Sequence, residues 1–126
     1  MAERWVLAIG DDWRIRKLIR ANLEPLGLEV REAVGTQHGL RRLGSVRPDL
    51  ILLDLELPNA EALQVLKSFP LGADGRRIPV IVMSAEPPSR QLMRDSQVTG
   101  HLAKPFAVPA LLEQVRWALG DALTRD

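Results

Sequence analysis

Two short apolar stretches constrain the fold of this chain most. Residues 50–53 and 79–83 are apolar at every position, and a polar residue, Asp54 or Ser84, directly follows each stretch. A strand that is apolar on both faces is typical of a parallel sheet that helices cover on both sides. We therefore expect both stretches to be inner strands of such a sheet.

Further segments alternate between strand and helix patterns along the chain. Strands are expected at residues 5–9, 28–33 and 101–103. A first helix is expected between a cap at Asp12 and a stop at Gly27, because apolar residues recur there at helical spacing. Four more helices are expected at residues 36–46, around residues 63–69, at 89–98 and at 108–123.

Five strands alternating with five helices predict an α/β fold. We expect one doubly wound (βα)5 domain over residues 1–126, with helices on both faces of a five-stranded parallel sheet. The flavodoxin-like strand order 2-1-3-4-5 is the natural arrangement for five such strands.

Composition excludes several classes of function. The net charge is +1, so no strong field favours nucleic acid or an acidic membrane as partner. No apolar run approaches the roughly 20 residues that a membrane span needs. The chain has no cysteine, which excludes disulfides and cysteine-based zinc sites. We expect a cytoplasmic protein with no membrane partner.

Polar residues follow the expected strands. Asp11 and Asp12 follow the first strand, Asp54 the third, Ser84 the fourth and Lys104 the fifth. In an open parallel sheet, ligands bind beyond the carboxyl ends of the strands, where the strand order reverses. These five side chains are therefore expected at one crevice.

The residue types at that crevice indicate a cation and a phosphoryl group. Three carboxylates at short range raise one another's pKa, and a divalent cation relieves this repulsion. Oxygen ligands favour Mg²⁺, which also accepts phosphate oxygens. Ser84 and Lys104 would supply a hydrogen-bond donor and a positive charge for a tetrahedral anion. A carboxylate can itself act as the nucleophile in phosphoryl transfer.

Several short motifs occur in order, each at an expected strand end. They are Asp11-Asp12, Asp54 with Leu57-Pro58, Ser84-Ala85 and Lys104-Pro105-Phe106. With these motifs the chain resembles the receiver domain of two-component response regulators from residue 5 to about residue 119.

The resemblance implies a function and a role for each residue. Asp54 would accept a phosphoryl group from the phosphohistidine of a sensor histidine kinase or phosphotransfer protein. Asp12 and Asp54 would bind Mg²⁺ directly, Asp11 through water, and the backbone carbonyl of Glu56 would complete the protein ligands.

The resemblance also implies a signal and an output. Lys104 and Ser84 would contact the phosphoryl group. A surface on the fourth helix, fifth strand and fifth helix would then change its binding to an output protein, or to an output domain beyond this chain. Such a domain catalyses only its own phosphorylation and dephosphorylation, so it is not a conventional enzyme.

Four features depart from the family pattern. Ala62 replaces a usual glycine, and Glu56 places a carboxylate beside the phosphoryl position, where it could slow phosphorylation, compete for the ion or pair with Lys104. His101 stands where many receivers have Tyr or Phe, so the switch is expected to be weaker or sensitive to pH. Pro87-Pro88 precede a fourth helix with few apolar positions, which predicts a short or shifted signalling face.

Three other functions compete with the phosphorylatable receiver. A degenerate receiver could act as a constitutive protein-interaction module. A small phosphatase is suggested by Asp54-Leu55-Glu56-Leu57. Such phosphatases resemble the haloacid dehalogenases, in which the nucleophile follows the first strand and a second Asp lies two positions later. Here Asp54 ends the third expected strand, and the second acidic residue is Glu56. A nucleic-acid role is supported only by the basic start of the first helix (Arg14, Arg16, Lys17, Arg20), which we interpret as a solvated face. Trp13 is expected to be partly covered at the rim of the site.

Overall fold

The computed structural model describes residues 4–43, 47–55, 59–95 and 97–120 of the chain, without the side chains of residues 59–62. Its sheet has five strands in the order β2-β1-β3-β4-β5, and every neighbouring pair is parallel. The strands are β1 (Trp5–Ile9), β2 (Glu29–Ala33), β3 (Leu50–Asp54), β4 (Val80–Ser84) and β5 (Val98–Ala103). The predicted sheet and strand order are confirmed.

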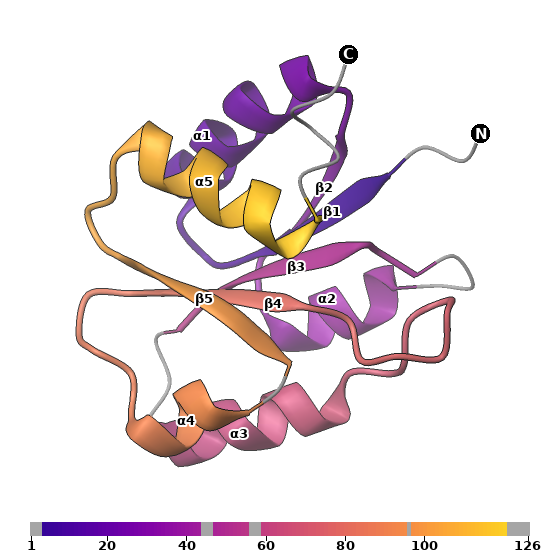
Figure 1. The fold of residues 1–126 in the computed structure, drawn as a ribbon, viewed down its shortest axis with the longest axis vertical. Coiled ribbons are helices and arrows are strands. Elements are labelled where there is room, and N and C mark those ends of the chain that lie inside the picture. The colour runs from indigo at the N-terminus through magenta and orange to yellow at the C-terminus, as the bar shows by residue number, and fades with distance from the viewer. Residues whose placement is uncertain (1–3, 44–46, 56–58, 96, 121–126) are drawn as a thin grey trace.

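Helices cover both faces of this sheet (Figure 1). They are α1 (Trp13–Leu23), α2 (Thr36–Arg42), α3 (Asn59–Ser68), α4 (Arg90–Arg94) and α5 (Val108–Ala118). Helices α1 and α5 lie on one side of the sheet, and α2, α3 and α4 lie on the other (Figure 1). The predicted doubly wound architecture is confirmed.

No helix in the described ranges combines the length and apolar character that a membrane crossing requires.

Alternate residues of each inner strand enter two separate hydrophobic cores. In β1, Val6 and Ala8 pack beneath α1 and α5, whereas Leu7 and Ile9 belong to the core beneath α2, α3 and α4. The strands β3 and β4 divide their side chains in the same way. A strand buried on both faces needs apolar residues throughout, which is why 50–53 and 80–83 contain no polar residue.

The first helix ends one turn earlier than predicted. Helix α1 stops at Leu23, and a short 3-10 turn, η1 (Glu24–Leu26), follows it. Pro25 explains the change, because it has no N–H to donate to the preceding turn. Gly27, at φ 88°, adopts the left-handed conformation that ends the segment.

The predicted helix at 89–98 is wrong over its second half. Helix α4 covers only Arg90–Arg94, and β5 already begins at Val98. The side chain of Ser89 caps α4 by accepting a hydrogen bond from the backbone N–H of Leu92, 3.1 Å away. The predicted helix at 36–46 ends at Arg42, and residues 44–46 and 121–123 of two predicted helices lie outside the described ranges.

Candidate functional site

Five of the predicted site residues follow or end strands at the carboxyl edge of the sheet, which is on the left in Figure 1. They are Asp11, Asp12, Asp54, Ser84 and Lys104. Register places the ends of the strands next to one another. Ile9 pairs with Leu53, Asp54 pairs with Met83, and Ser84 pairs with Ala103. Lys104 directly follows β5, and Asp11 and Asp12 follow β1 after Gly10.

Asp54 and Lys104 form the central contact of this edge. The Lys104 Nζ donates a hydrogen bond to Oδ1 of Asp54, and their side chains are 16% and 2% exposed, respectively. The backbone N–H of Lys104 also donates to the carbonyl of Ser84 at 2.9 Å, which fixes the start of its loop against β4. A buried carboxylate therefore lies beside a lysine ammonium, as a phosphoryl-accepting site would need.

Gly10 makes room for Asp54. A Cβ atom at Gly10 would lie 2.7 Å from Cβ of Asp54, which is closer than side chains approach. Gly10, Asp11 and Asp54 together line a cavity of about 210 Å³, which Gly35 at the start of α2 also borders. Two of the three predicted carboxylates therefore share one cavity.

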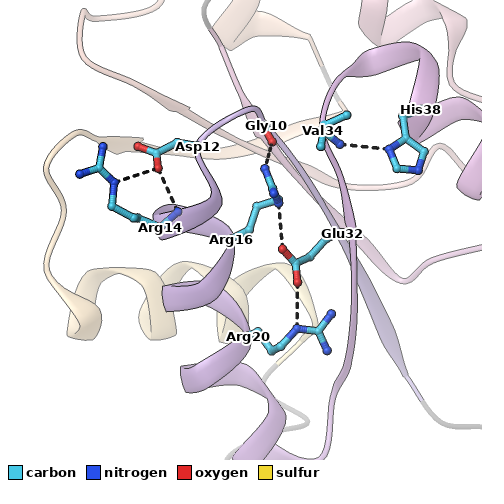
Figure 2. Close-up of polar contacts among 8 residues, drawn as sticks. All are labelled: Gly10, Asp12, Arg14, Arg16, Arg20, Glu32, Val34 and His38. Carbon is cyan, nitrogen blue, oxygen red and sulfur yellow. Dashed lines mark hydrogen bonds and ion pairs between the residues drawn. The ribbon is translucent and has the colours of Figure 1, made fainter.

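Asp12 caps α1, as predicted. Its Oδ1 accepts hydrogen bonds from the backbone N–H of Arg14 at 2.9 Å and from the Arg14 side chain at 3.4 Å (Figure 2). The backbone hydrogen bond is the main cause that lowers the pKa of Asp12, so the carboxylate stays ionised. Trp13, next to it, is 59% exposed and so less covered than expected.

The carboxylates lie on one edge but do not form a finished ligand cluster. Within the described ranges, no three carboxylate or imidazole side chains come close enough together to surround a metal ion. Asp12 is engaged with Arg14, and Asp54 with Lys104. Glu56, the fourth predicted ligand, lies outside the described residues, as do Leu57 and Pro58 of the family motif.

Ser84 and His101 contact each other directly. The Ser84 hydroxyl is buried and donates to the carbonyl of Glu86 at 2.5 Å, because a carbonyl only accepts. Its oxygen also lies 2.9 Å from Nε2 of His101. A hydroxyl has one proton, so Nε2 must carry the hydrogen of this second bond. Burial lowers the pKa of His101, which favours the neutral ring.

Sequence reasoning missed a polar network behind the acidic pair (Figure 2). Arg16 donates to the carbonyl of Gly10 at 2.5 Å and to Glu32 at 2.8 Å. Arg20 donates to the other oxygen of Glu32 at 3.0 Å. The prediction of a solvated basic face is therefore wrong for Arg16, although it holds for Arg14, which is exposed.

His38 also has a structural contact that the sequence did not reveal. Its Nδ1 accepts a hydrogen bond from the backbone N–H of Val34 at 3.2 Å (Figure 2). Gly35, the residue that precedes α2, offers no side-chain cap, so His38 supports the start of this helix from within it.

Comparison with known proteins identifies the family. A family model described as the response regulator receiver domain matches residues 6–116. The chain belongs to this family of receiver domains. It is therefore a CheY-like signalling module of the two-component type. The assignment of residues 1–126 to one domain stays a prediction.

Two curated relatives of this receiver domain are response regulators. The chain is 34% identical over 116 residues to the KDP operon transcriptional regulatory protein KdpE of Escherichia coli, covering 90% of the chain and 50% of KdpE. It is 33% identical over 122 residues to the polar-differentiation response regulator DivK of Brucella anthropi, covering 93% of the chain and 97% of DivK. The chain thus spans about half of one relative and nearly all of the other.

Solved structures share the fold. The chemotaxis response regulator CheY4 of Vibrio cholerae superposes with a TM-score of 0.79 at 25% identity, covering 94% of this chain and 100% of CheY4. The receiver domain of the sensor histidine kinase PA1611 of Pseudomonas aeruginosa, with a magnesium ion in its active-site cleft, superposes with a TM-score of 0.71 at 26% identity, covering 94% and 99%.

Proposed function

We propose that this receiver domain accepts a phosphoryl group on Asp54, with Mg²⁺, and signals through a change in partner binding. The observation that carries the proposal is the buried Asp54 carboxylate at a strand end, with the Lys104 ammonium against it. A structural ion pair is common in proteins, but Asp54 of this pair lines the same cavity as Asp11. A sensor histidine kinase or a phosphotransfer protein would be the donor.

The transfer needs little more than a nucleophile and a compensating charge. An oxygen of the Asp54 carboxylate attacks phosphorus, a P–O bond forms, and the P–N bond to the donor histidine breaks. The electron pair goes to the imidazole, which takes up a proton from solvent. The Lys104 ammonium is placed to move from the carboxylate to the phosphoryl oxygens as negative charge gathers there.

The residue types at this edge suit a hard divalent cation. Asp11, Asp12 and Asp54 offer carboxylate oxygens from two adjacent strand ends, and the lowered pKa of Asp12 keeps that ligand deprotonated. We propose that these three hold Mg²⁺ together with the carbonyl of Glu56, which lies outside the described residues. When bound, Mg²⁺ would neutralise charge on the phosphoryl oxygens. The magnesium in the PA1611 receiver supports this assignment.

Ser84 would carry the signal away from Asp54. To reach a phosphoryl group, its hydroxyl must leave the carbonyl of Glu86 and Nε2 of His101. His101 lines a cavity of about 790 Å³ between β5 and α5, which Met93 and Trp117 also border. A change at Ser84 would therefore reach the surface where an output protein or output domain could bind.

The alternative is a constitutive interaction module. The contact of Ser84 with both Glu86 and His101 favours it, because this contact resists the movement that a switch requires. In either case the chain would not act as a conventional enzyme, and a cytoplasmic location stays a prediction. Nucleic-acid binding has little support, since Arg16 of the basic first helix is engaged within the domain.

Intact mass after incubation with acetyl phosphate and Mg²⁺ tests the proposal. One added phosphoryl group is expected, dependent on the ion and absent from Asp54→Asn. Asp74→Asn, at an exposed turn far from the site in sequence, is the matched control and should keep the adduct. An unmodified wild-type chain would contradict the proposal and favour the constitutive module.

A further inference from the structure

We propose that Arg16 is a positioning residue, which holds the loop carrying Asp11 and Asp12 in the geometry that binds Mg²⁺. The proposal rests on the proposed function of this site, and it assigns a role to a side chain that touches neither the ion nor the phosphoryl group. Arg16 lies one turn into α1, and its side chain is only 14% exposed. It is therefore not part of a solvated face.

The guanidinium of Arg16 joins two segments of the chain (Figure 2). Its Nη1 donates to the carbonyl of Gly10 at 2.5 Å, and its Nε donates to Oε1 of Glu32 at 2.8 Å. Because a guanidinium is planar and its donors have fixed directions, both bonds together define where the carbonyl of Gly10 must lie.

Gly10 contacts both segments that carry the carboxylates of the site, residues 11–12 and Asp54. Its carbonyl belongs to the peptide group that joins it to Asp11, so the plane of that group sets the direction in which the acidic pair leaves β1. Its N–H donates to the carbonyl of Ala33 at 2.9 Å. A Cβ added at Gly10 would lie 2.7 Å from Cβ of Asp54, so Gly10 packs closely against that residue. With Arg16 in place, both polar groups of Gly10 are fixed.

Glu32 anchors Arg16 from the neighbouring strand. Its second oxygen accepts from Arg20 at 3.0 Å, so the carboxylate is held between two arginines. Burial raises the pKa of Glu32, but hydrogen bonds from Arg16 and Arg20 outweigh it and leave the pKa below its usual value. Glu32 therefore stays ionised at neutral pH, and its ion pair with Arg16 persists there.

A positioning role predicts that removing Arg16 weakens Mg²⁺ binding, whereas its charge alone predicts that removal strengthens it. Arg16 and Arg20 both carry a positive charge on the same helix, and both contact Glu32. Losing either charge would favour a nearby cation by electrostatics. Only the loss of Arg16 also releases the carbonyl of Gly10. The sign of the change in Mg²⁺ affinity therefore separates a positioning role from a general electrostatic effect.

The experiment compares Arg16→Gln with the matched control Arg20→Gln. For each, Mg²⁺ is titrated while tryptophan fluorescence is followed, since Trp13 adjoins the acidic pair. The rate of phosphorylation by acetyl phosphate is measured across the same Mg²⁺ range. We expect Arg16→Gln to need about tenfold more Mg²⁺ for half-saturation, as is typical for residues that orient metal ligands, while the rate at saturating Mg²⁺ stays near that of wild type. Arg20→Gln should need no more Mg²⁺ than wild type.

Each result leads to a distinct conclusion. Equal or lower Mg²⁺ requirement in Arg16→Gln overturns the positioning role, even where wild type is phosphorylated normally. The proposed function itself is overturned if Mg²⁺ does not change the fluorescence of the wild type and acetyl phosphate does not phosphorylate it. Should Arg16→Gln not fold, Arg16→Lys replaces it. The ammonium keeps the charge but lacks the planar fork whose donors fix both bonds, so a raised Mg²⁺ requirement is again expected. An unchanged requirement in that variant also overturns the proposal.

Discussion

The hydroxyl of Ser84 lies 2.9 Å from Nε2 of His101, 17 residues further along the chain. Because Ser84 donates its only proton to Glu86, the imidazole must donate from Nε2, and Nδ1 is the nitrogen that gains a proton when the ring titrates. Protonation therefore leaves the bond to Ser84 intact and adds charge on the other side of the ring. Titration of His101 would therefore act on the domain through this charge rather than through the loss of the hydrogen bond.

His101 should make folding stability depend on pH. Burial lowers the pKa of this histidine in the folded state below 6.5, so the unfolded chain binds the proton more readily. The free energy of unfolding should accordingly fall as the pH drops below about 6.5. His101→Gln, which keeps an N–H donor but does not titrate, should reduce this loss. Urea unfolding between about pH 8 and pH 5.5 measures the difference.

The charged neighbours of His101 need their own control. Glu113 and Arg116 border the same cavity as His101, and Glu113 is the acidic one of the two. Glu113→Gln should therefore retain the dependence that His101 causes. If the free energy of unfolding falls equally in wild type and in His101→Gln on acidification, protonation of His101 is not coupled to folding.

Gly10→Ala should damage the site itself. The added Cβ would lie 2.7 Å from Cβ of Asp54, so the backbone or Asp54 must move away. We expect a loss of about 1–3 kcal/mol in the free energy of unfolding and much slower phosphorylation. Gly35→Ala is the matched control, because Gly35 borders the same cavity but has open space around the new atom. A phosphorylation rate in Gly10→Ala equal to that of Gly35→Ala would count against close packing at Asp54.

Lys104→Met should leave Asp54 with a buried charge and no ammonium beside it. Removing one partner of a buried ion pair typically costs about 3 kcal/mol or more, and the Asp54 side chain is only 2% exposed. Mg²⁺ should recover part of this stability by neutralising Asp54. Urea unfolding with and without Mg²⁺ measures both effects, and phosphorylation by acetyl phosphate should be lost.

A double substitution isolates the pair. Adding Asp54→Asn to Lys104→Met removes the stranded charge, so the double variant should be more stable than Lys104→Met alone. Lys67→Met, at an exposed lysine near the end of α3, should change stability little. A double variant that is less stable than Lys104→Met would show that the pair is not what stabilises this edge.

Local patterns were sufficient for the inner sheet and for the positions of the acidic residues. Residues 50–53 are apolar throughout because both of their faces are buried, and Asp54 is therefore placed at a strand end by sequence alone. The beginning of β5 could not be predicted in this way. Gly100 weakens a strand pattern, and in the structure Oε1 of Gln114 on α5 fills the space beside it, 1.8 Å from where a Cβ would lie. That contact depends on the folded arrangement.

The polar contacts of the site depend on distant parts of the chain for the same reason. Arg16 shares its helix with exposed basic residues, and nothing in the local pattern distinguishes it from Arg14. Its partner Glu32 is 16 residues away and becomes a neighbour only when β2 pairs with β1. The bond between Ser84 and His101 likewise requires the register of β4 and β5.

Leu92 should decide whether α4 stays attached to the sheet. This helix has five residues, and Leu92 is the one among them that is buried. Leu92→Ala should lower the free energy of unfolding by about 2–5 kcal/mol, since it removes a fully buried side chain from the core beneath α3 and α4. Met93→Ala, next to it and 39% exposed, should cost less than about 0.5 kcal/mol. Urea unfolding of the two variants side by side makes the comparison, and equal costs would mean that α4 is held by contacts other than Leu92.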